Sequence, residues 1–172
     1  MRVTRFGILP GTLGTVQSVW AMRSLARSGR WHPLVRETAM LVVRSAGRDA
    51  HEQAYALRDW LDSNVHFLRD PDDIEALHTP EAMLRLLLTH GPPLAIDCDD
   101  AAILAAALGG AVGLKSRFVV VGISPSSSFR HVWTELTAPH GPQAGEWWEM
   151  DVTRAAQSIP VSAITRRWAI PV

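Results

Sequence analysis

Three side chains in this sequence have the chemistry of a nucleophile, a base and an orienting carboxylate. Cys98 is the only cysteine, His131 follows it by 33 positions, and Asp151 follows His131 by 20. An ionised cysteine attacks a carbonyl carbon, a histidine accepts and returns the proton, and a carboxylate holds that histidine in the required tautomer. A fold that brings them together makes a Cys-His-Asp triad for acyl transfer. The alternative stays open, because a lone cysteine is often a small buried hydrophobe.

Each of these residues falls at the boundary of a predicted structural element. Cys98 lies in the first turn of a helix rich in Ala, Ile and Leu, which runs on over residues 101–112 and should be the buried central helix. The free N–H groups at a helix start favour an anionic sulfur. His131 begins one predicted strand and Asp151 lies near the end of the next, so strand pairing would bring them together.

The remaining pattern predicts helices first and strands afterwards. Three amphipathic helices are predicted over Thr15 to Gly29 with Thr15 as the N-cap, from Pro33 to Gly47, and from the cap Asp49 to about Ser63. A loop with some extended structure follows over 64–79, with a turn at 70–73, and then a short helix from the cap Thr79 to His90. Strands are predicted over 117–123, 131–137 and 146–152, with an edge strand at 168–172. This order indicates an α+β fold in which helices cover one side of an antiparallel sheet of three to four strands.

Length and composition favour one folded domain over residues 1–172. Hydrophobic residues make up 47% of the chain and charged residues 20%. Seventeen basic and seventeen acidic residues cancel, so no cationic field points to nucleic acid or an anionic membrane. A single cysteine excludes a disulfide within the chain. No apolar run reaches about 18 residues, so we expect neither a signal peptide nor a membrane span, and a cytoplasmic protein.

Four ordered motifs resemble those of a known family. They are Ile96-Asp97-Cys98-Asp99-Asp100 with its Ala-rich helix, Arg117-Phe118-Val119-Val120, His131-Val132-Trp133-Thr134-Glu135, and Trp148-Glu149-Met150-Asp151-Val152-Thr153. Together they resemble the transglutaminase-like superfamily, a branch of the papain-like cysteine hydrolase fold. The resemblance implies Cys98 as nucleophile, His131 as base and Asp151 as orienting carboxylate. It also implies a catalytic core at 60–153, a helical lead-in at 1–59 and a C-terminal extension at 154–172. The layout is most similar to short bacteriophage and prophage members.

This resemblance implies a cysteine-dependent enzyme that acts on amide bonds of a peptide or protein substrate without a cofactor. Hydrolysis is favoured over transglutaminase crosslinking, because an amine must compete with solvent water and no sequence element builds a site for it. The alternative is a structural or binding protein, such as a phage virion or tail component, that uses the fold without turnover. The location would then be the host cytoplasm or the virion.

Secondary candidates surround the triad. His78 stands where the resemblance leads us to expect Gln, and it is a candidate second donor for the oxyanion. Trp133 and Trp147 are candidate walls of the substrate groove, with core packing as the ordinary alternative. The acids Asp97, Asp99 and Asp100 are more simply cap and dipole partners than metal ligands, so no metal is predicted. Surface or capping roles are expected for the remaining histidines, His32, His51, His66, His90 and His140.

Overall fold

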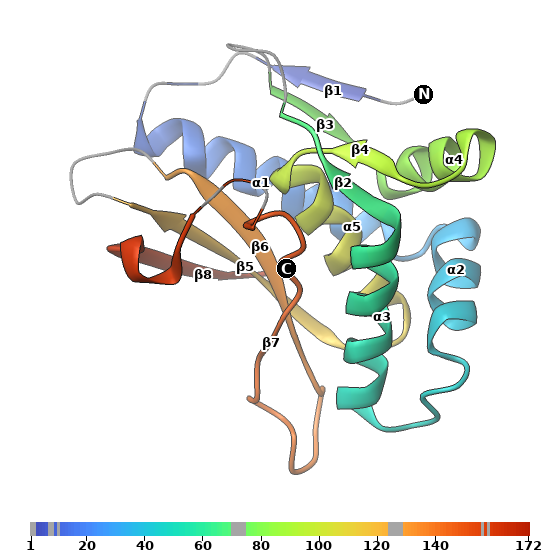
Figure 1. Ribbon diagram of the computed structural model, residues 1–172. Coiled ribbons are helices and arrows are strands. Elements are labelled where there is room, and N and C mark those ends of the chain that lie inside the picture. The colour runs from blue at the N-terminus through green and yellow to red at the C-terminus, as the bar shows by residue number, and fades with distance from the viewer. Residues whose placement is uncertain are drawn as a thin grey trace.

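The computed structural model describes residues 3–6, 9, 11–69, 75–123, 129–155, 157 and 159–172, with only the backbone of 3–6 and 75. The elements are β1 (Val3–Phe6), α1 (Thr12–Gly29), α2 (Pro33–Val43), α3 (Ala50–Asn64), β2 (Val65–Phe67), β3 (Glu75–His78), α4 (Pro80–His90), β4 (Leu94–Ile96), α5 (Cys98–Ala111), β5 (Lys115–Gly122), β6 (His131–Thr137), β7 (Trp148–Glu149), a 3-10 turn at Val161–Ala163, and β8 (Arg166–Pro171) (Figure 1). The predicted turn at 70–73 lies outside the described residues.

The architecture is the predicted α+β arrangement. Strands β5 to β8 form an antiparallel sheet in the order β7-β6-β5-β8. Helix α5 packs on β5 and β6 with one side and contacts α1, α2 and α3 with the other (Figure 1). The chemistry-bearing helix therefore lies at the centre of the molecule, between the sheet and the N-terminal helices.

Helix α5 fits this central place because its side chains are small. All residues from Asp100 to Gly109 are buried, and most of them are Ala, Leu or Ile. A Cβ at Gly109 would lie 2.5 Å from Leu136 Cδ2, so only glycine allows β6 to approach this closely. On the same face of β6, the Thr134 hydroxyl donates a 2.7 Å hydrogen bond to the carbonyl of Ala102. These two contacts fix the position of β6 along the helix.

Most predicted helix boundaries are confirmed, and two are wrong. Asp49 caps α3 and Thr79 caps α4 through side-chain hydrogen bonds, as expected. Helix α1 begins three residues before Thr15, because Gly11 at φ 65° takes the N-cap position and its carbonyl already accepts the Thr15 N–H. Helix α2 ends at Val43 rather than at Gly47, and turns follow.

The strand prediction is correct in order and wrong in several extents. Segment 64–79, expected to be mostly loop, holds β2 and β3, which pair with the unexpected strands β4 (parallel) and β1 (antiparallel). The strand expected over 146–152 shortens to β7, because the turn around Gly141 and Gly145 (both at positive φ) ends at residue 145 and irregular chain follows up to residue 147. The expected edge strand is present as β8.

Candidate active site

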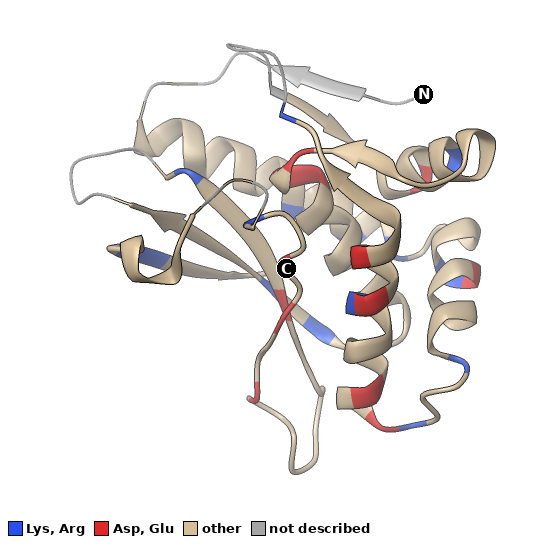
Figure 2. Ribbon diagram, in the orientation of Figure 1, with Lys and Arg blue, Asp and Glu red and all other residues tan. Residues whose placement is uncertain are grey.

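Cys98 is the first residue of α5 and follows directly from β4. Asp97 is the N-cap: its carboxylate accepts the Asp100 N–H at 3.0 Å, and its carbonyl accepts the Ala101 N–H. This cap stops the strand and turns the chain into the helix, which presents the sulfur at the positive end of the helix dipole. The first turn also carries Asp99 and Asp100, shown as acidic segments at the start of α5 in Figure 2.

The surroundings of the Cys98 sulfur oppose its ionisation. Burial of the sulfur raises the pKa of the thiol well above its usual range, and the negative charges of Asp99 and Asp97 raise it further. The thiol donates a 3.5 Å hydrogen bond to Asp99 Oδ1, which also favours the protonated form. The backbone N–H of Val132, next to His131, acts against these effects. A reactive thiolate here needs a cation beside it.

His131 and Asp151 form a buried pair. His131 Nε2 lies 2.8 Å from Asp151 Oδ2, and both side chains are fully shielded from solvent. The pairing of β6 with β7 continues through the Met150 N–H to Thr134 carbonyl bond, which places Asp151 across from Trp133, on the same side of the sheet as His131. Two neighbouring antiparallel strands thus bring together residues 20 positions apart.

Asp151 is held as an anion. Burial alone would raise the pKa of Asp151, but the hydrogen bond and the charge of His131 lower it, together with the backbone N–H groups of Arg154 and Thr153. The net result is a pKa below the usual value for a carboxyl group. The two backbone N–H groups lie 2.9 and 3.1 Å from Asp151 Oδ1. An ionised Asp151 requires the proton of a neutral His131 to be on Nε2, which leaves a lone pair on Nδ1.

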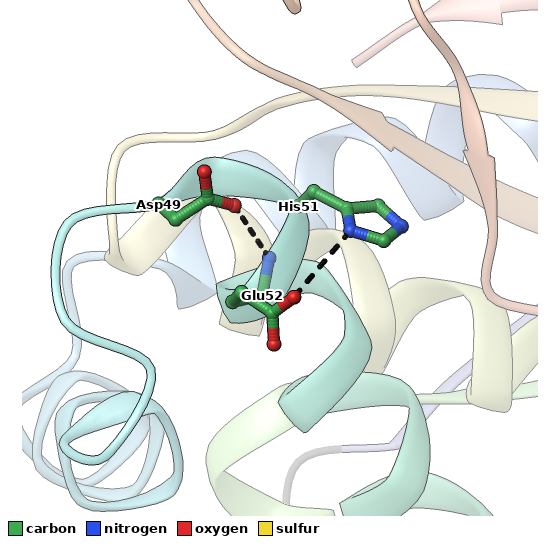
Figure 3. Close-up of side chains that lie close together, drawn as sticks. All are labelled: Asp49, His51 and Glu52. Carbon is green, nitrogen blue, oxygen red and sulfur yellow. Dashed lines mark hydrogen bonds and ion pairs between the residues drawn. The ribbon is translucent and has the colours of Figure 1, made fainter.

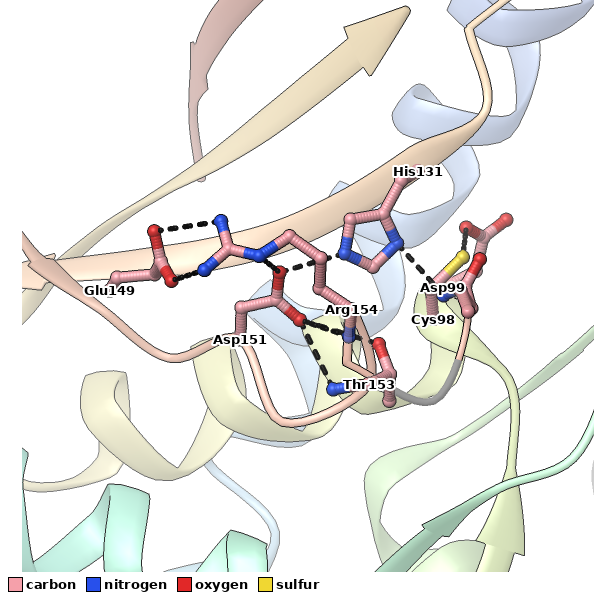
Figure 4. A network of polar contacts seen from close by, with 8 residues as sticks. Cys98, Asp99, His131, Glu149, Asp151, Thr153 and Arg154 are labelled. Atoms are coloured by element: carbon pink, nitrogen blue, oxygen red, sulfur yellow. Dashed lines mark hydrogen bonds and ion pairs between the residues drawn. The ribbon is translucent and has the colours of Figure 1, made fainter. Parts of the chain in front are cut away.

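The lone pair on His131 Nδ1 is met by Gln157. The Gln157 side-chain nitrogen lies 2.9 Å from Nδ1 and donates to it. Figure 4 shows His131 with Asp151 on one side of the ring and with Cys98 and Asp99 on the other. Among the described residues, the hydrogen bonds of the Cys98 sulfur go to Asp99 and Val132 and none goes to His131. Sequence reasoning missed Gln157, because no motif marks it.

The structure places His78 at the start of α5 by way of Asp100. The backbone N–H of His78 donates to Asp100 Oδ1 at 2.8 Å, and His78 Nδ1 lies 2.5 Å from Asp100 Oδ2. Asp100 is almost completely buried, so it ties the end of β3 to the helix that begins with Cys98. His78 thus contacts the first turn of the helix that begins with Cys98, and its oxyanion role stays a prediction. The cap interpretation is confirmed for Asp97, whereas the Asp100 carboxylate bonds His78 instead.

The two tryptophan candidates lie on the face of the sheet that is turned away from α5. Strand alternation puts His131, Trp133 and Glu135 on this face, while Val132, Thr134 and Leu136 face the helix. Trp133 is 3% exposed, and its ring centroid lies 5.6 Å from that of His131. Trp147 is partly exposed, with the Arg117 guanidinium 3.9 Å from its ring centroid. Trp133 therefore contacts the candidate base directly and Trp147 lies further along the strands.

One further cluster of potential metal ligands occurs among the described residues. Donor atoms of Asp49, His51 and Glu52 lie within 4.8 Å of one another at the start of α3 (Figure 3). All three side chains are exposed, and each has a structural partner: Asp49 caps the helix by accepting the Glu52 N–H, His51 packs edge-on against Trp148, and Glu52 Oε1 lies 3.8 Å from His51 Nδ1. The cluster is explained by helix capping. Among the residues that the structure describes, the acids near Cys98 do not form such a group.

No helix in the described part of the chain is long and apolar enough to cross a membrane. The sequence matches the family model of the transglutaminase-like superfamily over residues 36–152, about two thirds of the 172 residues. Searches among curated proteins and among solved structures each gave no significant match. The matched range starts within α2, includes Cys98, His131 and Asp151, and ends one residue after Asp151.

Proposed function

Since the chain belongs to the transglutaminase-like superfamily, whose members are generally cysteine peptidases and transglutaminases, we propose that it carries out acyl transfer at amide bonds with Cys98, His131 and Asp151. The observation that carries this proposal is the buried 2.8 Å pair of His131 and Asp151 beside the N-terminus of the helix that begins with Cys98. A buried carboxylate is costly unless it is hydrogen-bonded, and orientation of a base for a nearby nucleophile is a function that offsets this cost.

The proposed reaction follows from the positions of the protons. His131 Nδ1 accepts the thiol proton, the Cys98 thiolate forms a bond with the carbonyl carbon, and the tetrahedral intermediate collapses as the imidazolium returns its proton to the leaving amine. Asp151 stays ionised throughout and stabilises the imidazolium. Water then attacks the thioester with His131 as base, and the acid is released. The substrate class is a peptide or protein, with hydrolysis preferred to transfer onto an amine.

The test is acetylation by p-nitrophenyl acetate, followed by mass spectrometry of the intact protein. We expect an acetyl group on Cys98 that is absent in Cys98→Ala. His131→Ala should slow the loss of this acetyl group by about 10²- to 10⁴-fold, the usual contribution of a general base. His140→Ala, a change at an exposed histidine after β6, serves as the matched control. Equal rates of acylation and deacylation in wild type and His131→Ala would overturn the proposal and favour a structural or binding protein.

The choice of acceptor is tested in the same experiment by adding n-butylamine. A hydrolase should release mostly acetate, whereas a transglutaminase should release mostly N-butylacetamide at millimolar amine. Release of the amide as the main product would overturn the preference for hydrolysis and leave the triad intact. The bacteriophage assignment stays a prediction that depends on the resemblance alone.

A further inference from the structure

The contact between Gln157 and His131 has a consequence for the proposed nucleophile. A neutral imidazole has one lone pair, and in this site it belongs to Nδ1 because Nε2 donates to Asp151. That lone pair is the atom that must accept the Cys98 proton. It accepts a 2.9 Å hydrogen bond from the Gln157 side chain. Gln157 and Cys98 therefore compete for the same acceptor.

The other contacts of the sulfur agree with this competition. The Cys98 thiol donates to Asp99 Oδ1, so its proton points to a carboxylate and not to the imidazole. Figure 4 shows Cys98 and Asp99 on the side of His131 that is opposite to Asp151. In this arrangement the Cys98 thiol keeps its proton, and His131 Nδ1 is occupied by the hydrogen bond from Gln157. The structure thus has His131 bonded to Asp151 and Gln157, and no hydrogen bond joins Cys98 to His131 among the described residues.

The position of Gln157 is set by the same carboxylate that orients His131. Asp151 Oδ1 accepts the N–H groups of Thr153 and Arg154, which folds the chain into a turn directly after Asp151. The Gln157 N–H closes that turn by donating to the carbonyls of Thr153 at 3.3 Å and Arg154 at 3.1 Å. One short segment therefore supplies the hydrogen-bond partners of both ring nitrogens of His131.

We propose that Gln157 is a positioning residue that caps His131 Nδ1 in the resting site, so that His131 pairs with Cys98 only after this side-chain amide has moved away. The proposal rests on the proposed function of the triad and adds a step before it. In that step the Gln157 N–H to Nδ1 bond breaks, the thiol proton moves from sulfur to Nδ1, and a thiolate–imidazolium pair forms. Gln157 has three rotatable side-chain bonds, so rotation of the side chain alone can uncover Nδ1.

Several charged groups affect the proton transfer from Cys98 to His131, so their charges must be kept constant in a test. Asp97, Asp99 and Asp100 come from α5, and Asp151 with Arg154 comes from the segment after β7. Asp99 and Asp97 oppose a thiolate at Cys98, while the Arg154 side chain is engaged by Asp151 and Glu149. The variants of the test keep all of these charges, and Gln157→Glu alone adds a new one.

The test is the rate of Cys98 alkylation by iodoacetamide as a function of pH. Gln157→Met keeps the length of the side chain and removes its hydrogen-bonding groups. Wild type should react slowly at pH 7, with an inflection at or above the ordinary thiol value of about 8.5 and little effect of His131→Ala. Gln157→Met should react about twofold to tenfold faster, the range expected for loss of one competing neutral hydrogen bond. The gain should vanish in the double variant with His131→Ala.

Two controls separate a specific cap from a structural role. Gln143→Ala removes a glutamine that donates to exposed Asp49 and does not contact His131, so its alkylation profile should match wild type. Gln157→Glu keeps the size of the side chain and places a carboxylate on Nδ1–H. It should stabilise a capped imidazolium and react no faster than wild type. Acceleration by Gln157→Glu equal to that of Gln157→Met would overturn the cap, whether or not Gln157→Met folds fully.

The outcomes distinguish the cap from the triad. A Gln157→Met profile identical to wild type overturns the cap. A wild-type profile that already has a low inflection, lost in His131→Ala, overturns the cap and supports the triad. If the alkylation rate is independent of His131 in wild type and in Gln157→Met, both the cap and the triad are overturned. Faster alkylation of Gln157→Met that requires His131 supports both.

Discussion

Replacement of Asp151 by Asn should reveal how much the buried pair contributes to the fold. The carboxylate accepts hydrogen bonds from His131, Thr153 and Arg154. A hydrogen bond to a charged acceptor contributes about 1.5–3 kcal/mol, and one to a neutral acceptor about 0.5–1.5 kcal/mol. Three bonds that each lose about 1 kcal/mol give a decrease of about 3 kcal/mol in the free energy of unfolding. No discount for solvent screening applies, because the Asp151 side chain is fully buried.

The same substitution should invert the tautomer of His131. The introduced amide must keep its oxygen toward the N–H groups of Thr153 and Arg154, so its NH₂ group faces His131 Nε2. Nε2 then becomes the acceptor and the ring proton moves to Nδ1, which can no longer accept the Cys98 proton. Nitrogen-15 NMR of the His131 ring measures this exchange directly. A ring that keeps its proton on Nε2 in Asp151→Asn would refute the assignment.

Urea unfolding, followed by tryptophan fluorescence, measures the change in the free energy of unfolding. The dependence of this change on pH tests whether the ionised Asp151 carboxylate is its source. The folded state lowers the pKa of Asp151, so its stabilisation is present above the unfolded value of about 3.9 and is lost as the pH falls through the folded value. The difference between wild type and Asp151→Asn should therefore be largest near neutral pH and should shrink below about pH 4. A variant within about 0.5 kcal/mol of wild type at pH 7 would refute the reasoning.

The contact between α5 and β6 gives the remaining predictions. Gly109→Ala should lower the free energy of unfolding by about 1–3 kcal/mol, because the new Cβ would lie 2.5 Å from Leu136 Cδ2. At the neighbouring Gly110 the nearest atoms to a new Cβ belong to the Arg30 side chain, at 3.1 Å or more, so Gly110→Ala should be neutral or stabilising by up to about 1 kcal/mol. Equal effects in urea unfolding would contradict this account. Thr134→Val should cost about 1–2 kcal/mol through loss of the 2.7 Å bond to Ala102, and a Thr134→Val protein as stable as wild type would show that this bond contributes nothing.

The sequence could predict the elements that carry local signals. Helix starts were predictable where a capping side chain accepts a backbone N–H of the first turn, as at Asp49, Thr79 and Asp97. The structure has helices there. The run from Ala101 to Leu108 is apolar on every side, which is why its burial was predictable without knowledge of its neighbours. Strands β5 and β6 carry long β-branched and aromatic runs, and both were found close to their true bounds.

The missed features depend on contacts between distant segments. Strands β1 and β4 are four and three residues long, and each is defined by pairing with a partner far away in sequence. A run of three residues such as Leu94–Ile96 has no periodicity to detect. Gln157 is a similar case, since its role comes from a turn closed by Asp151 and not from the residue type. His78 was expected near the nucleophile, but its bond to Asp100 was not predictable from spacing.

The first turn of α5 shows a conflict between folding and reactivity. Asp97 is needed as the N-cap and Asp100 is needed to hold His78, so two of the three acids have structural duties. Burial raises the pKa of the Cys98 thiol, and the charges of Asp99 and Asp97 raise it further. Such a sulfur becomes a useful nucleophile only when an adjacent cation offsets these charges, and a protonated His131, itself stabilised by Asp151, is the group in place to do so. The acids therefore make the reactivity of Cys98 depend on contact with His131. This is the contact that the proposed Gln157 cap prevents.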